Sequence, residues 1–122
     1  MKGKLSCPHC NASNLSSELV NTVKVLENSL GFELIITSGL RCLDCNKLAG
    51  GVSSSAHLKG EAVDIALTGY NNTDTISSMR FKILSKALLI GIVRCGDGAT
   101  FLHIDVSKSL SQKVIFDYYK KG

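Results

Sequence analysis

Two histidines and one aspartate, far apart in the sequence, are the residues best suited to metal chemistry. His57 precedes Asp64 by seven positions, and His103 follows in a later apolar segment. Asp64 lies inside the apolar stretch AVDIAL, where a carboxylate is costly unless it is paired or bound to a metal. A lone histidine is more often an ordinary polar residue. Two imidazoles with one carboxylate, however, form the three-ligand set of open catalytic zinc sites, in which water takes the fourth position.

Period-two alternation gives segment 101–106 two different faces. The aliphatic face, which we expect to point into the core, consists of Leu102, Ile104 and Val106. The opposite face carries His103 together with Asp105 and Phe101. A histidine and a carboxylate therefore share the face that the core leaves open, which favours the metal interpretation of His103.

The elements that must position these residues follow from hydrophobic periodicity. Helices are predicted at 16–30, where Ser16 or Ser17 can cap the start, and at 74–90. Strands are predicted at 33–37, 62–67, 92–95, 100–106 and 114–119, with the turn Gly96-Asp97-Gly98 joining the third strand to the fourth. The polar segment 38–60 is long for a connection, and such loops tend to be functional. This order predicts an α+β fold, a small antiparallel sheet packed with two main helices, in one domain of residues 1–122.

Composition limits the classes of protein that fit. The chain has 122 residues, 44% of them hydrophobic and 20% charged, which suits one globular domain. No apolar run approaches the roughly 20 residues of a membrane span, and the first residues lack the apolar core of a secretory signal, so we expect synthesis in the cytoplasm. The net charge of +4 suits a polyanionic target, nucleic acid or cell wall alike.

The pattern around the first histidine resembles that of a known peptidase family. Its residues are Ser55, His57, Gly60, Ala62 and Asp64, followed by the strand with His103. This pattern is similar to that of the zinc D-alanyl-D-alanine carboxypeptidases and L-alanyl-D-glutamate endopeptidases, whose superfamily also holds the hedgehog signalling domain. The upstream stretch ITSGLRC, residues 36–42, is also similar, and the resemblance spans about residues 7–106.

The resemblance implies a fold, a cofactor and a reaction. The fold would be hedgehog-like, with His57, Asp64 and His103 as ligands of one catalytic zinc ion. The reaction would be hydrolysis of peptide bonds in peptidoglycan stem peptides, of the D,D-carboxypeptidase or L-Ala-D-Glu endopeptidase type. Arg41 would hold a carbonyl or carboxylate of the substrate, and Ser55 would lie beside the substrate or support the first ligand. The alternatives are an ion pair that pins the loop for Arg41 and a turn residue for Ser55.

The resemblance also suggests where the protein acts and with what. Compact forms of this family without a signal peptide are typical of phage lysis proteins. We therefore expect a monomer that reaches the cell wall or periplasm after release and takes a peptidoglycan peptide as substrate. We expect neither a nucleic-acid partner nor a membrane span.

The general base is the point where the sequence departs from the family. Many members carry an acid three residues before the last histidine, and Thr100 occupies that position here. Asp97 and Asp105 are the nearby substitutes, and Asp97 is our choice because it lies on the predicted turn, which can bend a carboxylate over the zinc site. The alternatives are a plain turn residue for Asp97 and an orienting partner of a ligand for Asp105.

Four of the five cysteines form two C-x2-C units. They are Cys7 and Cys10, and Cys42 and Cys45, with 31 residues between the units. Paired units of this kind are typical of structural zinc sites, although the usual separation is about 15 to 20 residues. We expect the four thiols to lie close together around a second, structural zinc ion, with disulfides as the alternative. Cys95 is expected to be a small core residue.

Two other functions are compatible with parts of the sequence. A zinc-ribbon-like nucleic-acid-binding module would use the two C-x2-C units and the positive charge, but it leaves the histidines and Asp64 unexplained. A non-catalytic hedgehog-like zinc domain that binds cell wall would keep the metal without a base, and Thr100 supports it.

Overall fold

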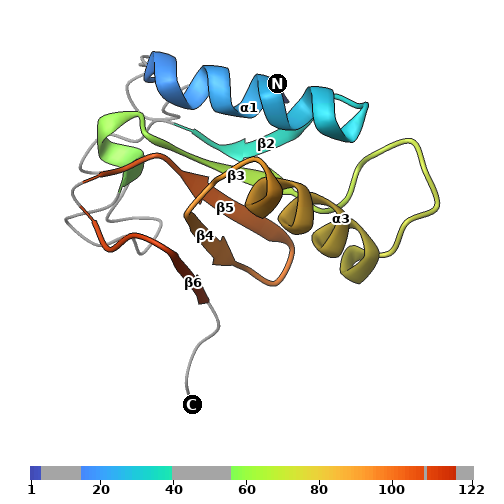
Figure 1. The fold of residues 1–122 in the computed structure, drawn as a ribbon. Helices are drawn as coiled ribbons and strands as arrows, with labels where there is room; N and C mark the ends of the chain where they lie inside the picture. The colour runs from blue at the N-terminus through green and yellow to red at the C-terminus, as the bar shows by residue number, and fades with distance from the viewer. Residues whose placement is uncertain (4–14, 40–55, 109, 118–122) are drawn as a thin grey trace.

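The computed structural model describes residues 1–3, 15–39, 56–108 and 110–117. In chain order the elements are β1 (Lys2–Gly3), α1 (Ser17–Leu30), β2 (Ile35–Ser38), the 3-10 turn η1 (Ala56–Lys59), β3 (Ala62–Ala66), α3 (Ile76–Leu89), β4 (Arg94–Asp97), β5 (Phe101–Asp105) and β6 (Val114–Asp117). The six strands form one sheet in the order β1-β2-β3-β5-β4-β6, with both helices packed beside it (Figure 1). The α+β class predicted from the sequence is therefore confirmed.

The sheet is mixed, which differs from the antiparallel sheet that we predicted. The pairs β2–β3, β3–β5 and β4–β5 are antiparallel, so the prediction holds for the centre. At the two edges, β1 pairs with β2 and β6 pairs with β4 in the parallel sense. Strand β1 was not predicted, because two residues are too few to show alternation. Strand β6 is parallel to β4 because the chain reverses direction once after β5, which is itself antiparallel to β4.

Side-chain caps and buried faces explain the two helices. The Ser16 hydroxyl accepts a hydrogen bond from the Leu19 amide at 3.1 Å, and Gly31 ends α1 with a positive φ of 82°. The Thr75 hydroxyl caps α3 by accepting from the Ser78 amide, also at 3.1 Å. The buried positions are Leu19, Val23 and Leu26 on α1 and Met79, Ile83 and Ala87 on α3. Both helices thus begin and end within two residues of the predicted bounds.

The turn between β4 and β5 lies later in the chain than we predicted. Gly96 and Asp97 belong to β4, where they pair with His103 and Leu102 of β5. The amide of Gly98 then donates to the carbonyl of Phe101 at 3.0 Å, which closes the turn over 98–100. The predicted turn at 96–98 is wrong because cross-strand pairing continues through both residues, in spite of their low intrinsic strand preference.

One face of the sheet and the two helices share a single hydrophobic core. From the central strands, Val63, Ile65, Leu102 and Ile104 enter this core and are at most 1% exposed. Alternation then places Asp64 and His103 on the opposite face, as predicted from the sequence. Among the described residues, no helix has both the length and the hydropathy that crossing a membrane requires.

A pair of leucine substitutions tests the position of the core. Leu26 of α1 is fully buried, whereas Leu89 at the end of α3 is 77% exposed. Leu26→Ala should lower the free energy of unfolding by about 2–5 kcal/mol, because it leaves a cavity in the core. Leu89→Ala should change it by less than about 0.5 kcal/mol. Urea denaturation followed by circular dichroism measures both, and equal losses would contradict the packing described here.

Candidate metal centre

Cross-strand register and a short turn bring the two histidines to Asp64. Asp64 of β3 lies directly opposite His103 of β5 on the face away from the helices. His57 lies on η1, which leads into β3 through Gly60 with a φ of 68°. The amide of Glu61 donates to the carbonyl of Ala56 at 3.1 Å, and this bond folds η1 back onto the start of β3. Residues 7 and 39 positions from Asp64 thus meet it from two sides.

A single carboxylate oxygen lies between the two imidazole rings. Asp64 Oδ1 is 3.2 Å from His57 Nε2 and 3.0 Å from His103 Nδ1. The rings meet edge to face, with centroids 5.1 Å apart. All three residues are buried, with exposed fractions of 2% for His57, 6% for Asp64 and 3% for His103. One ligand atom from each lies within 4.8 Å of the others, which makes the three a compact donor set.

The second nitrogen of each ring identifies where its proton lies. His57 Nδ1 is 2.7 Å from the carbonyl oxygen of Gly39, at the end of β2. His103 Nε2 is 2.7 Å from Asp105 Oδ2. A carbonyl and an ionised carboxylate only accept hydrogen bonds, so His57 Nδ1 and His103 Nε2 must be the donors. In a neutral imidazole the other nitrogen then presents a lone pair, and both of these lone pairs face Asp64.

Two lone pairs that face one carboxylate oxygen require a cation between them. Protons can supply that charge, and so can a metal ion. Ligands at about 2.0–2.1 Å from a tetrahedral zinc ion lie about 3.3–3.4 Å apart, close to the 3.0 and 3.2 Å found here. Outer partners on the far nitrogens, a backbone carbonyl and a carboxylate, are also what metal-bound histidines usually have. The donor set therefore fits a zinc ion.

The surroundings of Asp64, His103 and Asp105 shift the pKa of each side chain toward its charged form. Burial alone would raise the pKa of Asp64, but hydrogen bonds and Coulomb attraction from His103 and His57 outweigh it and lower that pKa. Burial would lower the pKa of His103, but Asp105 and Asp64 outweigh it and raise that pKa. The pKa of Asp105 is lowered in spite of burial, because His103 and Arg94 donate to it. The site is thus built to hold positive charge between carboxylates.

Arg94 is a member of this network that the sequence analysis missed. It lies opposite Asp105 in the sheet, and its Nε donates to Asp105 Oδ1 at 2.6 Å. Only 8% of Arg94 is exposed. Phe116 of β6 packs against both Arg94 and His103. The centre of its ring is 5.3 Å from the guanidinium carbon of Arg94 and 5.4 Å from the centre of the His103 ring. The signal was present in the sequence, because Arg94 is a charged residue inside an apolar segment, as Asp64 is.

Asp97, our predicted base, lies outside the His57–Asp64–His103 group. Its carboxylate forms an ion pair with Arg80 of α3, with Nε and Oδ1 2.6 Å apart, although the angles are not those of a hydrogen bond. Cys95 on the same side of β4 belongs to the core, so Asp97 points toward the helix layer.

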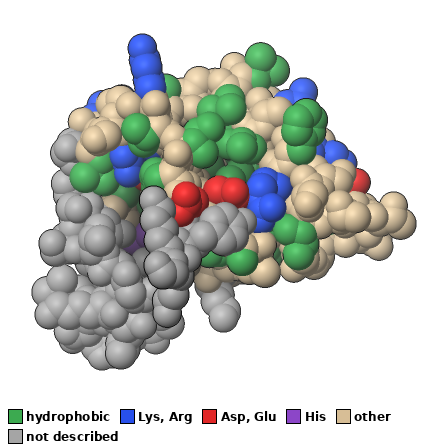
Figure 2. Space-filling model, turned by 90° about the horizontal axis from the view of Figure 1, so that it is seen from below, with side chains coloured by type: hydrophobic (Ala, Val, Ile, Leu, Met, Phe, Trp, Pro, Cys, Tyr) green, Lys and Arg blue, Asp and Glu red, His purple; other side chains and the backbone are tan. Residues whose placement is uncertain are grey.

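Figure 2 shows acidic and basic side chains next to each other on the face seen from below, with only a small patch of histidine surface.

Several predicted site residues lie outside the described part of the chain. These are Arg41, Ser55 and the four cysteines of the C-x2-C units, Cys7, Cys10, Cys42 and Cys45, so their roles stay predictions. Cys95 is described: it is fully buried in the core, as predicted, and burial raises the pKa of its thiol to about 11. Thr100, at the place of the usual family acid, lies in the turn before β5 with its side chain exposed.

Comparison with known proteins identifies a family for this chain. A search of curated proteins found no match. The model of the peptidase M15 family matches residues 2–105, which include His57, Asp64, His103 and Asp105. Because that match covers most of the 122 residues, the resemblance seen in the sequence is confirmed, and the chain belongs to the peptidase M15 family.

Proposed function

We propose that this protein is a zinc peptidase that hydrolyses peptide bonds in peptidoglycan stem peptides. Its zinc ligands would be His57, Asp64 and His103. The observation that carries the proposal is the pair of imidazole lone pairs aimed at one buried carboxylate oxygen, in a chain of the peptidase M15 family. We further propose that residues 1–122 form one domain that acts as a monomer on the cell wall after release.

A zinc ion in this site would lower the pKa of a water molecule to about 7 and polarise the carbonyl of the scissile bond. The residues of the chain supply position and charge for that chemistry. Gly39 and Asp105 fix the two histidine rings through hydrogen bonds of 2.7 Å. The burial of Asp64 keeps bulk water from competing for its oxygen atoms. Arg41 and Ser55 are the residues that we propose for substrate binding.

The structure as it stands brings no well-suited general base to the proposed zinc site among the described carboxylates. Asp105 accepts from His103 on one oxygen and from Arg94 and the amide of Ser107 on the other. Such a carboxylate is well suited to orienting a ring and weak as a proton acceptor. We therefore keep Asp97 as the proposed base. To act, the end of β4 would have to rearrange, because the Asp97 carboxylate pairs with Arg80 on the helix side of the sheet, opposite the face that carries His103.

One alternative has an observation in its favour. The ion pair between Asp97 and Arg80, together with Thr100 at the usual acid position, suits a non-catalytic zinc domain that binds cell wall. Such a domain would hold the metal for stability and bind peptidoglycan without turnover. Turnover by the zinc-loaded protein decides between the two.

The metal assignment is tested by zinc content. His57→Ala and Asp64→Asn should each contain one zinc equivalent fewer than the wild type, because each removes a ligand. The matched control is Asp74→Asn, which removes a partly exposed carboxylate paired with Lys82 at 2.7 Å and should keep the full zinc content. Atomic emission on folded, dialysed protein measures the metal. Unchanged zinc in both ligand variants would refute the assignment.

Incubation with purified peptidoglycan tests the reaction. The zinc-loaded wild type should release products that mass spectrometry identifies, either a terminal alanine or a peptide freed at an L-Ala-D-Glu bond. Asp64→Asn protein serves as the control and should release neither. If the wild type binds zinc and peptidoglycan but yields no cleaved peptide, the non-catalytic alternative is correct.

Single-site kinetics test the base. Asp97→Asn should lower kcat by about 10² or more with zinc retained, since that is the usual contribution of a general base. Asp105→Asn should instead weaken zinc binding, because it loosens His103. Wild-type kcat in Asp97→Asn would remove Asp97 from the mechanism. An inactive Asp105→Asn protein with full zinc affinity would pass the role to Asp105.

A further inference from the structure

A chain of three hydrogen bonds leads from the proposed metal centre to the segment between β5 and β6. His103 Nε2 donates to Asp105 Oδ2 at 2.7 Å, and Arg94 Nε donates to Asp105 Oδ1 at 2.6 Å. Arg94 Nη1 then donates to the carbonyl of Ser111 at 2.6 Å. The two ends of one guanidinium thus bind the Asp105 carboxylate and the segment that follows β5.

The two oxygen atoms of Asp105 bind different donors, and this fixes the orientation of the carboxylate. Oδ1 accepts from Arg94 and, at 3.1 Å, from the amide of Ser107, while Oδ2 receives the proton of His103. With Oδ1 held from two sides, rotation about the side-chain bonds of Asp105 would break two hydrogen bonds. The plane in which His103 finds its partner is therefore fixed by Arg94.

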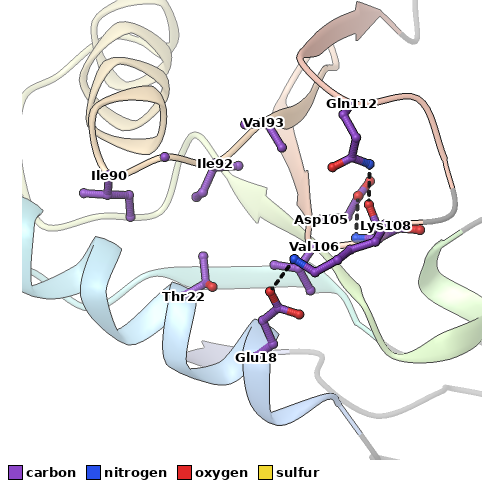
Figure 3. Close-up of a pocket in the computed structure, with 11 residues that line it drawn as sticks. Glu18, Thr22, Ile90, Ile92, Val93, Asp105, Val106, Lys108 and Gln112 are labelled. Carbon is purple, nitrogen blue, oxygen red and sulfur yellow. Dashed lines mark hydrogen bonds and ion pairs between the residues drawn. The ribbon is translucent and has the colours of Figure 1, made fainter.

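The segment after β5 is itself held in place next to Asp105. Gln112 Nε2 donates to the carbonyls of Ser107 and Leu110 at 2.7 and 2.6 Å. Figure 3 shows Gln112, Asp105 and Val106 on one side of a pocket of about 130 Å³, with Glu18 of α1 on the other. None of the three proposed zinc ligands lines this pocket, so the pocket is separate from the proposed metal site.

The cost of burial argues that the ion pair has a role beyond joining two strands. Arg94 is 8% exposed and the Asp105 side chain is fully buried. Apolar residues of similar size often stabilise a fold as well as or better than a buried ion pair does. The buried pair of Arg94 and Asp105 is useful if Asp105 must accept a hydrogen bond in a fixed direction. A histidine ring that binds a metal requires such a fixed acceptor.

We propose that Arg94 is a positioning residue of the metal centre: it holds Asp105, and through Asp105 it fixes the ring of His103. This inference rests on the proposed function for its purpose, since a fixed ring matters only if His103 is a ligand. Phe116 closes the network, because its ring packs against both Arg94 and His103. The role is one of orientation, and Arg94 touches neither substrate nor metal.

The test compares two arginines that have similar ion pairs on opposite faces of the sheet. Arg94→Gln removes the charge and the two-sided contact, and it should lower zinc affinity by up to about 10-fold, less than the 10–100-fold usual for losing the direct partner of a metal-bound histidine. Arg94→Lys keeps the charge but cannot reach both acceptors at once, so its loss should be smaller yet measurable. Arg80→Gln breaks the other 2.6 Å ion pair, with Asp97, and should keep wild-type zinc affinity. Competition with a chelator measures all three.

A second readout needs no metal. In the metal-free wild type, the proton on His103 Nε2 should give a slowly exchanging NMR signal because it is buried in a 2.7 Å hydrogen bond. That signal should broaden or vanish in Arg94→Gln and persist in Arg80→Gln. Wild-type zinc affinity together with an unchanged signal in Arg94→Gln overturns the inference. If Arg94→Gln does not fold, the same result in Arg94→Lys overturns it.

The two proposals fail in different ways. A wild type that binds no zinc refutes the proposed function, while the NMR signal of the metal-free protein still decides whether Arg94 positions His103. A wild type that binds zinc, with no effect of either Arg94 variant, refutes only the role of Arg94.

Discussion

The pairing of β3 with β5 is the constraint on which the rest of this structure depends. The register that sets Val63 opposite Ile104 and Ile65 opposite Leu102 fills the core on one face. The same register sets Asp64 opposite His103 on the other face. A shift by one residue would send the acid and the histidine into the helix layer and expose the aliphatic side chains. The hydrophobic energy of the core therefore also fixes the geometry of the polar group.

Much of this arrangement could be predicted because it follows from local alternation and periodicity. The segment FLHIDV has one aliphatic face, so the side of the sheet on which His103 and Asp105 lie follows from the sequence alone. The two helices follow from their caps and their apolar stripes. Asp64 was identified because a charge in an apolar strand must have a partner, and the structure provides two.

The features that could not be predicted depend on contacts between distant segments. The parallel pairing at both edges has no local signature, since β1 has only two residues and β6, although predicted as a strand, finds β4 only in the folded sheet. Gly96 and Asp97 have the composition of a turn, and only the ladder with β5 shows that they belong to a strand. A charge inside an apolar segment marks Arg94 in the sequence, but only its hydrogen bond to Asp105 in the folded sheet shows that it belongs to the site.

The distance along the chain between Asp64 and His103 also bears on the lifetime of the folded protein. The two residues are 39 positions apart, so they meet only after the chain has closed a loop whose entropic cost rises with the logarithm of its length. The unfolded chain has no comparable arrangement of donors, so an ion that binds this group stabilises the native state selectively. Contacts made after the central strands have paired mainly slow unfolding and have little effect on the rate of folding. A bound metal ion would then lower the rate of unfolding, and so the rate of proteolysis of the unfolded chain, whether or not the protein cleaves a substrate.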